Sequence, residues 1–346
     1  MANSKKHKSK PSEGLLFHAV QSRRFGTSIC FLCGRRLGTK NRADEHVISR
    51  WLQDRFCLWD HRLYLLNKTS IPYRQLKIPC CDECNNEHLA KFEASMREAV
   101  EKGADEVIAQ DPLVPFIWLG KILYGLLYKE FFLHLERRNP TKGRIVSRSM
   151  LRRYGTHHLF LQAARAPLVF RDSFPASIFV FRTQASKDPR LQFDFCDSYD
   201  WLTISLRLGA VGMVAALQDG GAQRQIHAPD LERYRAIDFH PLQFAELTAM
   251  FFYKASLMNR VPKYMTIEAS GRVVVCQPPL GGFTTAPLFD DWDQAAYARI
   301  LSQFTGYPLQ DIFRPPNQVA SWLHNEKGEV RAMDLESNPW SRGLAR

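Results

Sequence analysis

Two Cys-x-x-Cys pairs constrain this chain more than any other feature, Cys30-Phe-Leu-Cys33 and Cys81-Asp-Glu-Cys84. Each pair forms a tight turn that presents two thiolates to one ion, and two such turns complete a tetrahedral site of four sulfur atoms. We therefore predict a structural zinc ion bound by these four cysteines, which ties the long intervening loop to the rest of the module. The alternative is a pair of reduced dithiols with redox chemistry.

Cys80 adds an ambiguity, because it could replace Cys81 as a ligand. Cys81 is preferred, since its spacing to Cys84 equals the spacing within the first pair. The other three cysteines are isolated in apolar surroundings, and we expect them to be small core residues. They are Cys57, Cys196 and Cys276.

The charge of the chain is concentrated beside the first cysteine pair. The net charge is +12, and residues 1–42 contain ten Lys and Arg against one acid, Glu13, a net +9. Such a segment is attracted to a polyanion, because each phosphate that it neutralises releases condensed counterions. We therefore expect contact with nucleic acid, with a solubilising tail as the alternative.

The N-terminus lacks the features of a secretion signal, because residues 1–11 are polar and basic with no apolar run behind them. The most apolar stretch, 112–133, is interrupted by Lys121, Lys129 and Glu130. A membrane span needs about 20 mostly apolar residues, so we predict a buried amphipathic helix instead. We expect a cytoplasmic protein without a membrane partner, whose thiols are reduced.

The chain has 346 residues, of which 45% are hydrophobic, enough for an ordinary core and about two domains. We predict an α+β fold with a flexible basic tail (1–26), a small zinc-braced module (27–104) and a larger mixed α+β domain (105–346). Apolar periodicity predicts helices at 87–100, 112–138, 241–259 and 291–304. Strand composition predicts strands at 177–182, 191–195, 202–208 and 211–217, and a hairpin of 265–268 with 272–276. The adjacent His157 and His158 are expected at the surface.

The residues between and after the cysteine pairs carry the candidate chemistry. Glu45 and His46 precede two strand-forming residues in the segment Ala-Asp-Glu-His-Val-Ile. Asn85 follows Cys84 directly, and His88 comes three residues later, on the same helical face. These four side chains could meet around a single cation.

The order Cys-x-x-Cys, Glu-His-Val-Ile, Cys-x-x-Cys-Asn-x-x-His resembles the HNH endonuclease family over about residues 27–95. The resemblance implies a ββα-metal fold in which zinc braces a catalytic hairpin and helix. It assigns His46 as the general base that activates water for attack on phosphorus. It also implies that Glu45, Asn85 and His88 surround one catalytic Mg²⁺ or Mn²⁺ ion.

The chemistry of these residues fits hydrolysis of a phosphodiester bond. That reaction needs an activated water and a cation that stabilises charge on the phosphate and the departing oxygen. Glu45 and Asn85 offer the hard oxygen ligands that Mg²⁺ and Mn²⁺ prefer. An imidazole with a pKa near 6.5 accepts a proton at neutral pH.

One position departs from the family pattern. The middle asparagine of the motif is replaced by Leu76, and the nearest upstream asparagine is Asn67. That residue mainly holds the loop by hydrogen bonds, so the adjacent Gln75 is a candidate substitute.

Each candidate residue also has a plain structural alternative. His46 could be a core histidine, Glu45 an exposed charge, Asn85 a helix cap and His88 a surface residue. Several basic residues could contact phosphates, and Trp51 could pack the module or line a groove. They are Arg35, Arg36, Lys40, Arg42, Arg50 and Lys77.

We therefore expect a metal-dependent HNH endonuclease that acts on DNA, in phage defence or restriction. RNA is a weaker alternative substrate. The residues after 104 would supply recognition, homodimerisation or docking of a partner protein. The alternative function is a non-catalytic, zinc-binding nucleic-acid-binding protein with a degenerate HNH fold.

Overall fold

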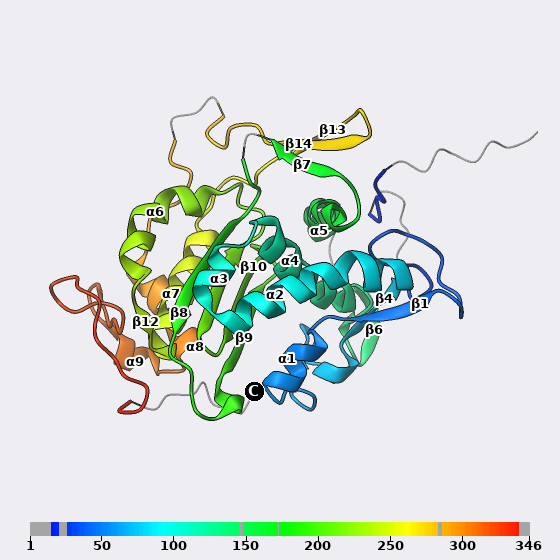
Figure 1. Cartoon of the computed structure of the whole chain (residues 1–346). Coiled ribbons are helices and arrows are strands. Elements are labelled where there is room, and N and C mark those ends of the chain that lie inside the picture. The colour runs from blue at the N-terminus through cyan, green and yellow to red at the C-terminus, as the bar shows by residue number, and fades with distance from the viewer. Residues whose placement is uncertain (1–14, 21–25, 145–147, 172, 283–285, 339–346) are drawn as a thin grey trace, which may run out of the picture.

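The computed structural model describes residues 15–20, 26–144, 148–171, 173–282 and 286–338 (Figure 1). Most of the predicted basic tail lies outside these residues. Within them, helices alternate irregularly with antiparallel and parallel strands, so the predicted α+β class is confirmed.

The cysteine-bearing part is built on one antiparallel strand pair, β1 (Arg42–His46) with β4 (Lys77–Cys81). The long connection between them holds α1 (Arg50–Arg55) and a short hairpin of β2 (Arg62–Tyr64) and β3 (Ser70–Pro72). After β4 the chain enters a π-helical turn at Cys84–Leu89, which continues as α2 (Ala90–Lys102). The helix predicted at 87–100 is therefore confirmed, and it ends at Gly103, whose φ is positive.

Helix α4 (Leu113–Glu130) is buried on all sides, which corrects two predictions about it. It is not amphipathic, because even Lys121 and Glu130 are buried, and a helix without a polar face lies inside a protein. It also ends at Glu130 instead of Arg138, because the chain turns there into a hairpin of β5 (His134–Glu136) and β6 (Asn139–Arg144). None of the described helices has the length and apolar character needed to cross a membrane.

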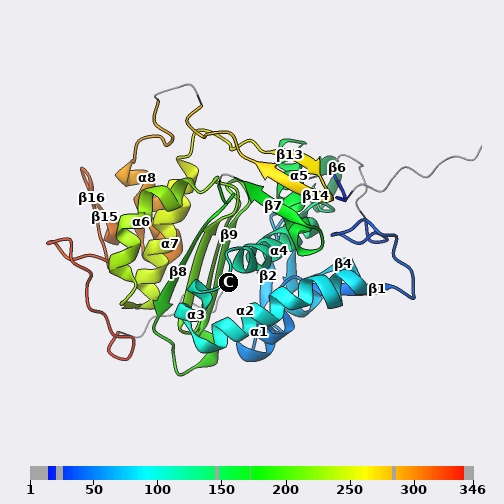
Figure 2. The ribbon, with the colours of Figure 1, turned by 45° about the horizontal axis from the view of Figure 1, so that its top comes forward.

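A five-stranded sheet in the order β12-β8-β11-β10-β9 forms the centre of the molecule. Its strands are β8 (Ser177–Thr183), β9 (Phe193–Ser198), β10 (Thr203–Leu208), β11 (Val211–Ala216) and β12 (Asp238–Phe239). The four strands predicted between 177 and 217 are thus confirmed. Figure 2 shows α6 (Ala222–Tyr234) and α7 (Pro241–Ser256) on one side of this sheet, with α3 (Ala104–Ile108) and α4 on the other. Strands β10 and β11 are buried throughout, because layers cover both faces.

The remaining elements surround this centre. Helix α5 (Arg148–Leu161) packs on α4, and β7 (Leu168–Arg171) joins the predicted hairpin of β13 (Met265–Ala269) and β14 (Arg272–Cys276) in a three-stranded sheet. Near the C-terminus, α8 (Gln294–Thr305) packs on α7 and is followed by α9 (Leu309–Ile312) and the short strands β15 (Phe313–Arg314) and β16 (Gln318–Val319). The predicted helices at 241–259 and 291–304 are confirmed.

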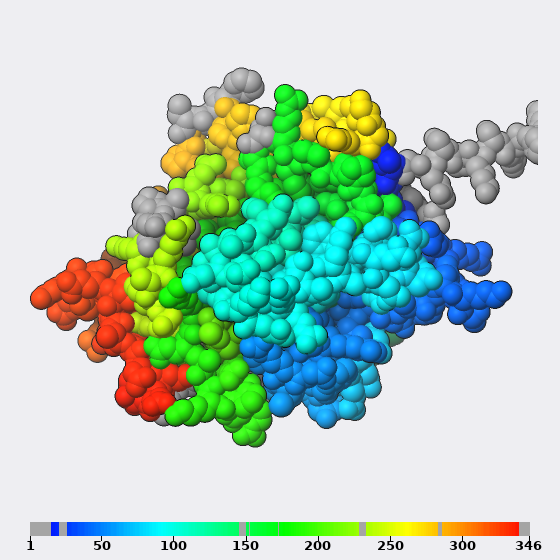
Figure 3. All heavy atoms as spheres, viewed as in Figure 1, coloured from blue at the N-terminus to red at the C-terminus, as the bar shows by residue number. Residues whose placement is uncertain are grey.

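One hydrophobic core cluster crosses the domain boundary that we predicted after residue 104. It contains Cys30 and Val47 from the N-terminal part together with Leu123, Leu206 and Val275 from the rest of the chain. Figure 3 shows the same continuity on the surface, where the cyan atoms of α2 and α3 lie between the blue N-terminal segments and the green strands. The cysteine-bearing module is therefore packed into the rest of the protein.

The three isolated cysteines are less buried than we predicted. Cys57 is exposed, because it lies in a turn directly after α1 with a φ of 56°. Cys196 lies on β9, the edge strand of the central sheet, and Cys276 is the last residue of β14, the middle strand of the three-stranded sheet. Both cysteines are half-buried.

Candidate metal centre and the neighbouring histidine

The two Cys-x-x-Cys turns meet at one point. The sulfur atoms of Cys30, Cys33, Cys81 and Cys84 all lie within 4.8 Å of one another, and Cys33 Sγ is 3.7 Å from Cys81 Sγ. A tetrahedral zinc site with Zn–S bonds near 2.3 Å has sulfur–sulfur edges of about 3.8 Å. The four cysteines therefore fit a zinc ion, and the predicted metal site is consistent with this geometry.

Local backbone geometry explains why the first turn has this shape. The amide of Cys30 donates to Arg35 O at 2.8 Å, and the amide of Gly34 donates to Cys30 O at 3.0 Å. Gly34 has a φ of 73°, a conformation that glycine adopts without strain. In the second turn, the amide of Cys84 donates to Cys81 Sγ at 3.5 Å.

Helix α5 and the 3-10 turn that follows it, Gln162–Ala164, support the first cysteine turn, which the sequence did not predict. His158 Nε2 donates to Phe31 O at 2.7 Å, and Gln162 Nε2 donates to Leu32 O at 2.9 Å. Both acceptors lie between the two cysteines of the first pair. His157 and His158 are buried, so the surface location expected for them is wrong.

Cys80 lies next to the sulfur cluster without belonging to it. Its Sγ is 3.9 Å from Cys30 Sγ, but the set of four mutually close sulfur atoms contains Cys81 instead. Cys80 also lies close to Cys84, so the alternation of β4 does not separate it from the cluster, and the choice of Cys81 rests on the mutual distances of the four sulfur atoms. This supports the preference for Cys81.

Glu45 does not point into open space but into a buried ion-pair network. Lys121 Nζ, from α4, donates to Glu45 Oε1 at 2.8 Å, to Glu93 Oε1 at 2.5 Å and to His46 O at 3.2 Å. Lys121 is 1% exposed. One ammonium group thus joins β1, α2 and α4.

Two tryptophans complete the network around Glu93. Trp51 Nε1 and Trp118 Nε1 both donate to Glu93 Oε2, at 3.0 and 3.1 Å. Burial raises the pKa of Glu45, while for Glu93 the effect of burial is outweighed by Lys121, which lowers its pKa. Glu93 therefore holds the negative charge opposite Lys121, and Glu45 is the easier of the two carboxylates to protonate.

The network includes residues that the sequence did not single out. Lys121 was visible in the sequence as a lysine inside an apolar stretch, which is the pattern expected of a buried cation with acidic partners. Its partners could not be predicted, because Glu45 and Glu93 precede it by many residues and lie on separate elements.

His46 is a neutral imidazole surrounded by cations. Burial lowers its pKa to about 4, with further lowering by the charges of Lys77, Arg50 and Lys121. Arg50 Nε donates to His46 Nε2 at 3.3 Å, and Gln53 Nε2 lies 3.4 Å from Nδ1. At neutral pH this ring is unprotonated, so it can accept a proton, and its surroundings favour an anion.

Asn85 and His88 lie at the end of the helix next to the four cysteines. Asn85 Nδ2 donates to Asn86 Oδ1, and His88 Nε2 is 3.6 Å from Glu83 Oε1. Both side chains are half-buried. Their recorded partners are neighbours along the chain and do not include Glu45 or His46.

The helix explains this separation. Asn85 is eight residues before Glu93, which corresponds to about 12 Å along a helix that rises 1.5 Å per residue. Glu45 and Glu93 both pair with Lys121, so Glu45 lies near the Glu93 end of this stretch and not near Asn85. Among the described residues, the four cysteines are the one group of three or more His, Cys, Asp or Glu whose ligand atoms lie within 4.8 Å. Glu45, His46 and His88 do not form such a group.

Leu76, which stands where the family pattern has its middle asparagine, holds the loop through its backbone instead of a polar side chain. Leu76 is buried, and its carbonyl accepts from the amide of Val47 at 2.9 Å. Gln75 is exposed, and Asn67 hydrogen-bonds to His134 O and the amide of Thr69 instead.

Two of the arginines that we predicted to contact phosphates already form ion pairs with acidic side chains. Arg35 pairs with Glu83 at 2.5 Å, and Arg42 pairs with Asp44 at 3.0 Å. Arg50 remains directed at His46, which places one guanidinium beside the candidate base.

Comparison with known proteins identifies no relative. No protein-family model, no curated protein and no solved structure matches the chain. Function is therefore argued from the residues of the site.

Proposed function

We propose that this protein is an HNH-type endonuclease that hydrolyses DNA phosphodiester bonds with His46 as general base. The observation that carries the proposal is the environment of His46, a neutral imidazole at the end of a strand braced by the four-cysteine site. Arg50 and Lys77 beside it provide positive charge for a phosphate. The position of these groups fits both an anionic substrate and proton removal from water.

In the proposed reaction, a water molecule attacks phosphorus while His46 takes one of its protons. The new phosphorus–oxygen bond forms as the bond to the 3′ oxygen breaks, and that oxygen takes a proton from solvent. Arg50 and Lys77 hold the phosphate and oppose its negative charge. Because phosphate contacts carry little sequence information, these residues supply position and affinity.

The proposed catalytic Mg²⁺ or Mn²⁺ ion is less well accommodated. Glu45 is paired with Lys121, and Asn85 and His88 have other partners, so these three residues do not fit a cation as a set in this structure. No step above depends on them. A cation bound by Glu45 would compete with Lys121 for the charge of this carboxylate.

This same ion pair favours a second candidate function. A zinc-stapled module whose acidic residue is neutralised by an internal lysine would bind nucleic acid without cutting it. The basic residues near the first cysteine pair would still give salt-dependent binding.

A plasmid-nicking assay with Mg²⁺, with Mn²⁺ and with chelator distinguishes these functions. We expect nicking by the wild-type chain and a loss of about 10²–10⁴-fold in His46→Ala, the usual contribution of a general base. His61→Ala, in the loop between β1 and β4, is the control and should retain activity. DNA binding without any product would establish the second function, and equal nicking by His46→Ala would exclude His46 as the base.

A further inference from the structure

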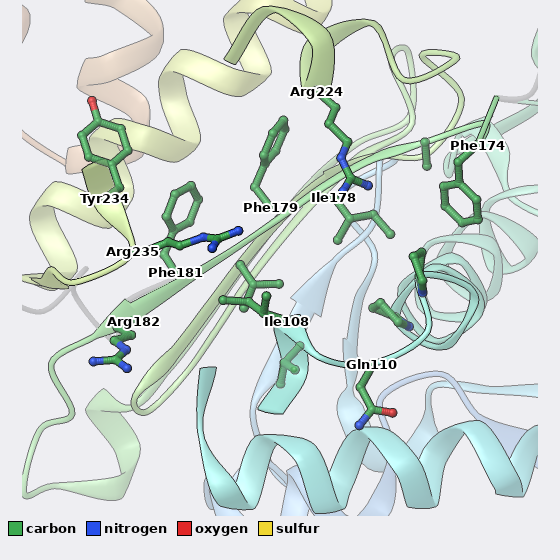
Figure 4. Close-up of a pocket in the computed structure, with 15 residues that line it drawn as sticks. Ile108, Gln110, Phe174, Ile178, Phe179, Phe181, Arg182, Arg224, Tyr234 and Arg235 are labelled. Atoms are coloured by element: carbon green, nitrogen blue, oxygen red, sulfur yellow. The ribbon is translucent and has the colours of Figure 1, made fainter. Parts of the chain in front are cut away.

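A pocket of about 170 Å³ opens at the edge of the central sheet, away from the cysteine cluster. Strand β12 pairs with β8 at Arg182 and Thr183 alone, so no described strand lies on that side of the part of β8 before Arg182. The pocket lies along this edge, between α3 and α6 (Figure 4).

The pocket has an apolar floor. Phe179 and Phe181 of β8 and Val107 of α3 line it and are almost fully buried, and Ile178 and Ile108 complete its walls. An engineered apolar cavity of about 150 Å³ binds benzene, so this volume suits one ring or a short chain.

The rim of the pocket is cationic. Arg224 at the start of α6 and Arg235 directly after its end both point over the β8 edge in Figure 4. Arg182 also lines the pocket but pairs with Asp105. Among the residues whose side chains the structure describes, no acid lines the pocket and Arg224 forms no ion pair.

We propose that this pocket binds a small amphipathic anion, an organic acid with one ring-sized apolar group. The apolar group lies on the Phe179–Phe181 floor, and its anionic group lies between Arg224 and Arg235. Two guanidinium groups above an apolar floor match both halves of such a ligand. The terminal segments of the chain outside the described residues do not fit this rim, because residues 1–14 and 339–346 are basic overall.

The test uses two fluorinated probes of the same shape, 4-fluorobenzoate and 4-fluorobenzyl alcohol, titrated with the full chain in ¹⁹F NMR. We expect the acid to bind about tenfold or more tightly than the alcohol, because bonds between charged groups and the arginines are lost in the alcohol. The double variant Arg224→Gln/Arg235→Gln should bind both probes alike, and Ile108→Glu should weaken binding of the acid alone.

Arg299→Gln, on the exposed face of α8, is the matched control and should leave both affinities unchanged. The proposal is overturned if neither probe binds the wild-type chain or if both bind equally. It is also overturned if the double arginine variant keeps the preference for the acid.

A separate observation concerns β13, an exposed edge strand. All five of its residues are exposed, and β14 is its one neighbour among the strands of the described part of the chain. Ile267, Val274 and Val169 lie in one row across the three strands, and Ile267 is 52% exposed. The strand contains no proline or lysine, the residues that usually protect such an edge from pairing.

The register of the hairpin determines which backbone groups face outward. Ser270 and Gly271 form a two-residue turn with positive φ at both positions, so the flanking pair Ala269–Arg272 is hydrogen-bonded. Hydrogen-bonded and non-hydrogen-bonded pairs alternate along an antiparallel ladder. The N–H and C=O groups of Thr266 and Glu268 therefore point away from β14.

From this register we infer that β13 pairs with β13 of a second copy around a twofold axis at Ile267. In that arrangement Thr266 of each chain lies opposite Glu268 of the other chain. These two pairs give four backbone hydrogen bonds, and no like charges lie opposite one another. The two Ile267 side chains meet in a non-hydrogen-bonded pair, where side chains approach most closely. The strand is short, so the dimer depends on concentration.

Sedimentation velocity over a range of concentrations tests this dimer. We expect the wild-type chain to dimerise, Ile267→Glu and Ile267→Lys to be monomeric alone, and an equal mixture of these two variants to dimerise again. Leu135→Glu, on exposed strand β5, is the control and should dimerise like the wild type. A wild-type chain that is monomeric throughout, or a mixture that stays monomeric, would refute the proposed pairing.

Discussion

Lys121 shows how one residue determines the character of the candidate site. It is buried between Glu45 and Glu93, and both carboxylates depend on it for compensation of their charge. Burial acts to lower the pKa of Lys121, but the two carboxylates raise it, so the lysine stays charged. The cluster holds two carboxylates and one ammonium, and its stability rests on that single cation.

Replacing this cation should therefore destabilise the protein strongly. We expect Lys121→Met to lower the free energy of unfolding by about 3–5 kcal/mol, because removing one partner leaves buried charge without compensation. Urea unfolding followed by circular dichroism measures the effect. Lys129→Met, on the same helix and half-buried, should change stability far less. Equal stability of the two variants would show that Lys121 does not pair with Glu45 and Glu93 in solution.

Helix α5 shows what an element contributes that no single residue reveals. Its histidines bond in two directions, His157 to Gly120 O of α4 at 2.9 Å and His158 to Phe31 O in the first cysteine turn. Gly120 allows this approach, because a Cβ there would lie 3.0 Å from the His157 ring. The helix thus couples the metal centre to the core.

The zinc affinity should depend on this helix. His158→Phe removes the donor to Phe31 O, and loss of a group that orients metal ligands typically costs about 10–100-fold in affinity. Competition with a chromophoric chelator measures this change. His157→Phe is the matched control, because His157 bonds to α4 and not to the cysteine turn. Equal zinc affinity in both variants would contradict a supporting role for His158.

The same helix should make stability depend on pH. Burial lowers the pKa of His157 and of His158 to about 4, whereas an unfolded histidine has a pKa near 6.5. Between these values the unfolded chain binds more protons than the folded chain, so stability falls as the pH drops from about 6.5 to 4, by up to about 3 kcal/mol for each histidine. Unfolding midpoints across this range measure the slope. His157→Gln should reduce it, and an unchanged slope would show that His157 does not titrate in this way.

At the scale of the whole molecule, the cysteine-bearing segment is part of a common core. The core cluster contains residues from Leu16 to Val275 and is not interrupted at the predicted domain boundary. Buried groups on β1, α2 and α4 share one ion-pair network across that boundary. Loss of a bound metal should therefore also destabilise the central sheet.

Cys84→Ala tests this continuity. We expect the variant to lose zinc and to unfold in one cooperative transition at a lower temperature, because its module has no separate core. Metal analysis, circular dichroism and tryptophan fluorescence measured on the same sample follow the change. The exposed Cys57→Ala is the control and should retain zinc and melting temperature. Two separate transitions in Cys84→Ala would indicate independent domains.

The sequence by itself determined the features that depend on local pattern. The spacing within each Cys-x-x-Cys pair predicted which four sulfur atoms meet, strand composition predicted the strands between 177 and 217, and apolar periodicity predicted helix α7. Such features follow from residues close together in the chain. The interpretation of His46 as a base that is neutral at physiological pH remains a prediction, supported by its surroundings.

The tertiary structure alone decided the partners of Glu45 and the burial of His157 and His158. Each depends on how α2, α4 and α5 pack, and packing joins residues whose separation in the chain carries no periodic signal. Burial then changes the chemistry, because a carboxylate or imidazole removed from water must find a partner or change its pKa. The two cysteine pairs thus located the candidate metal centre, whereas the packing around them determined which neighbouring side chains remain available for the proposed catalysis.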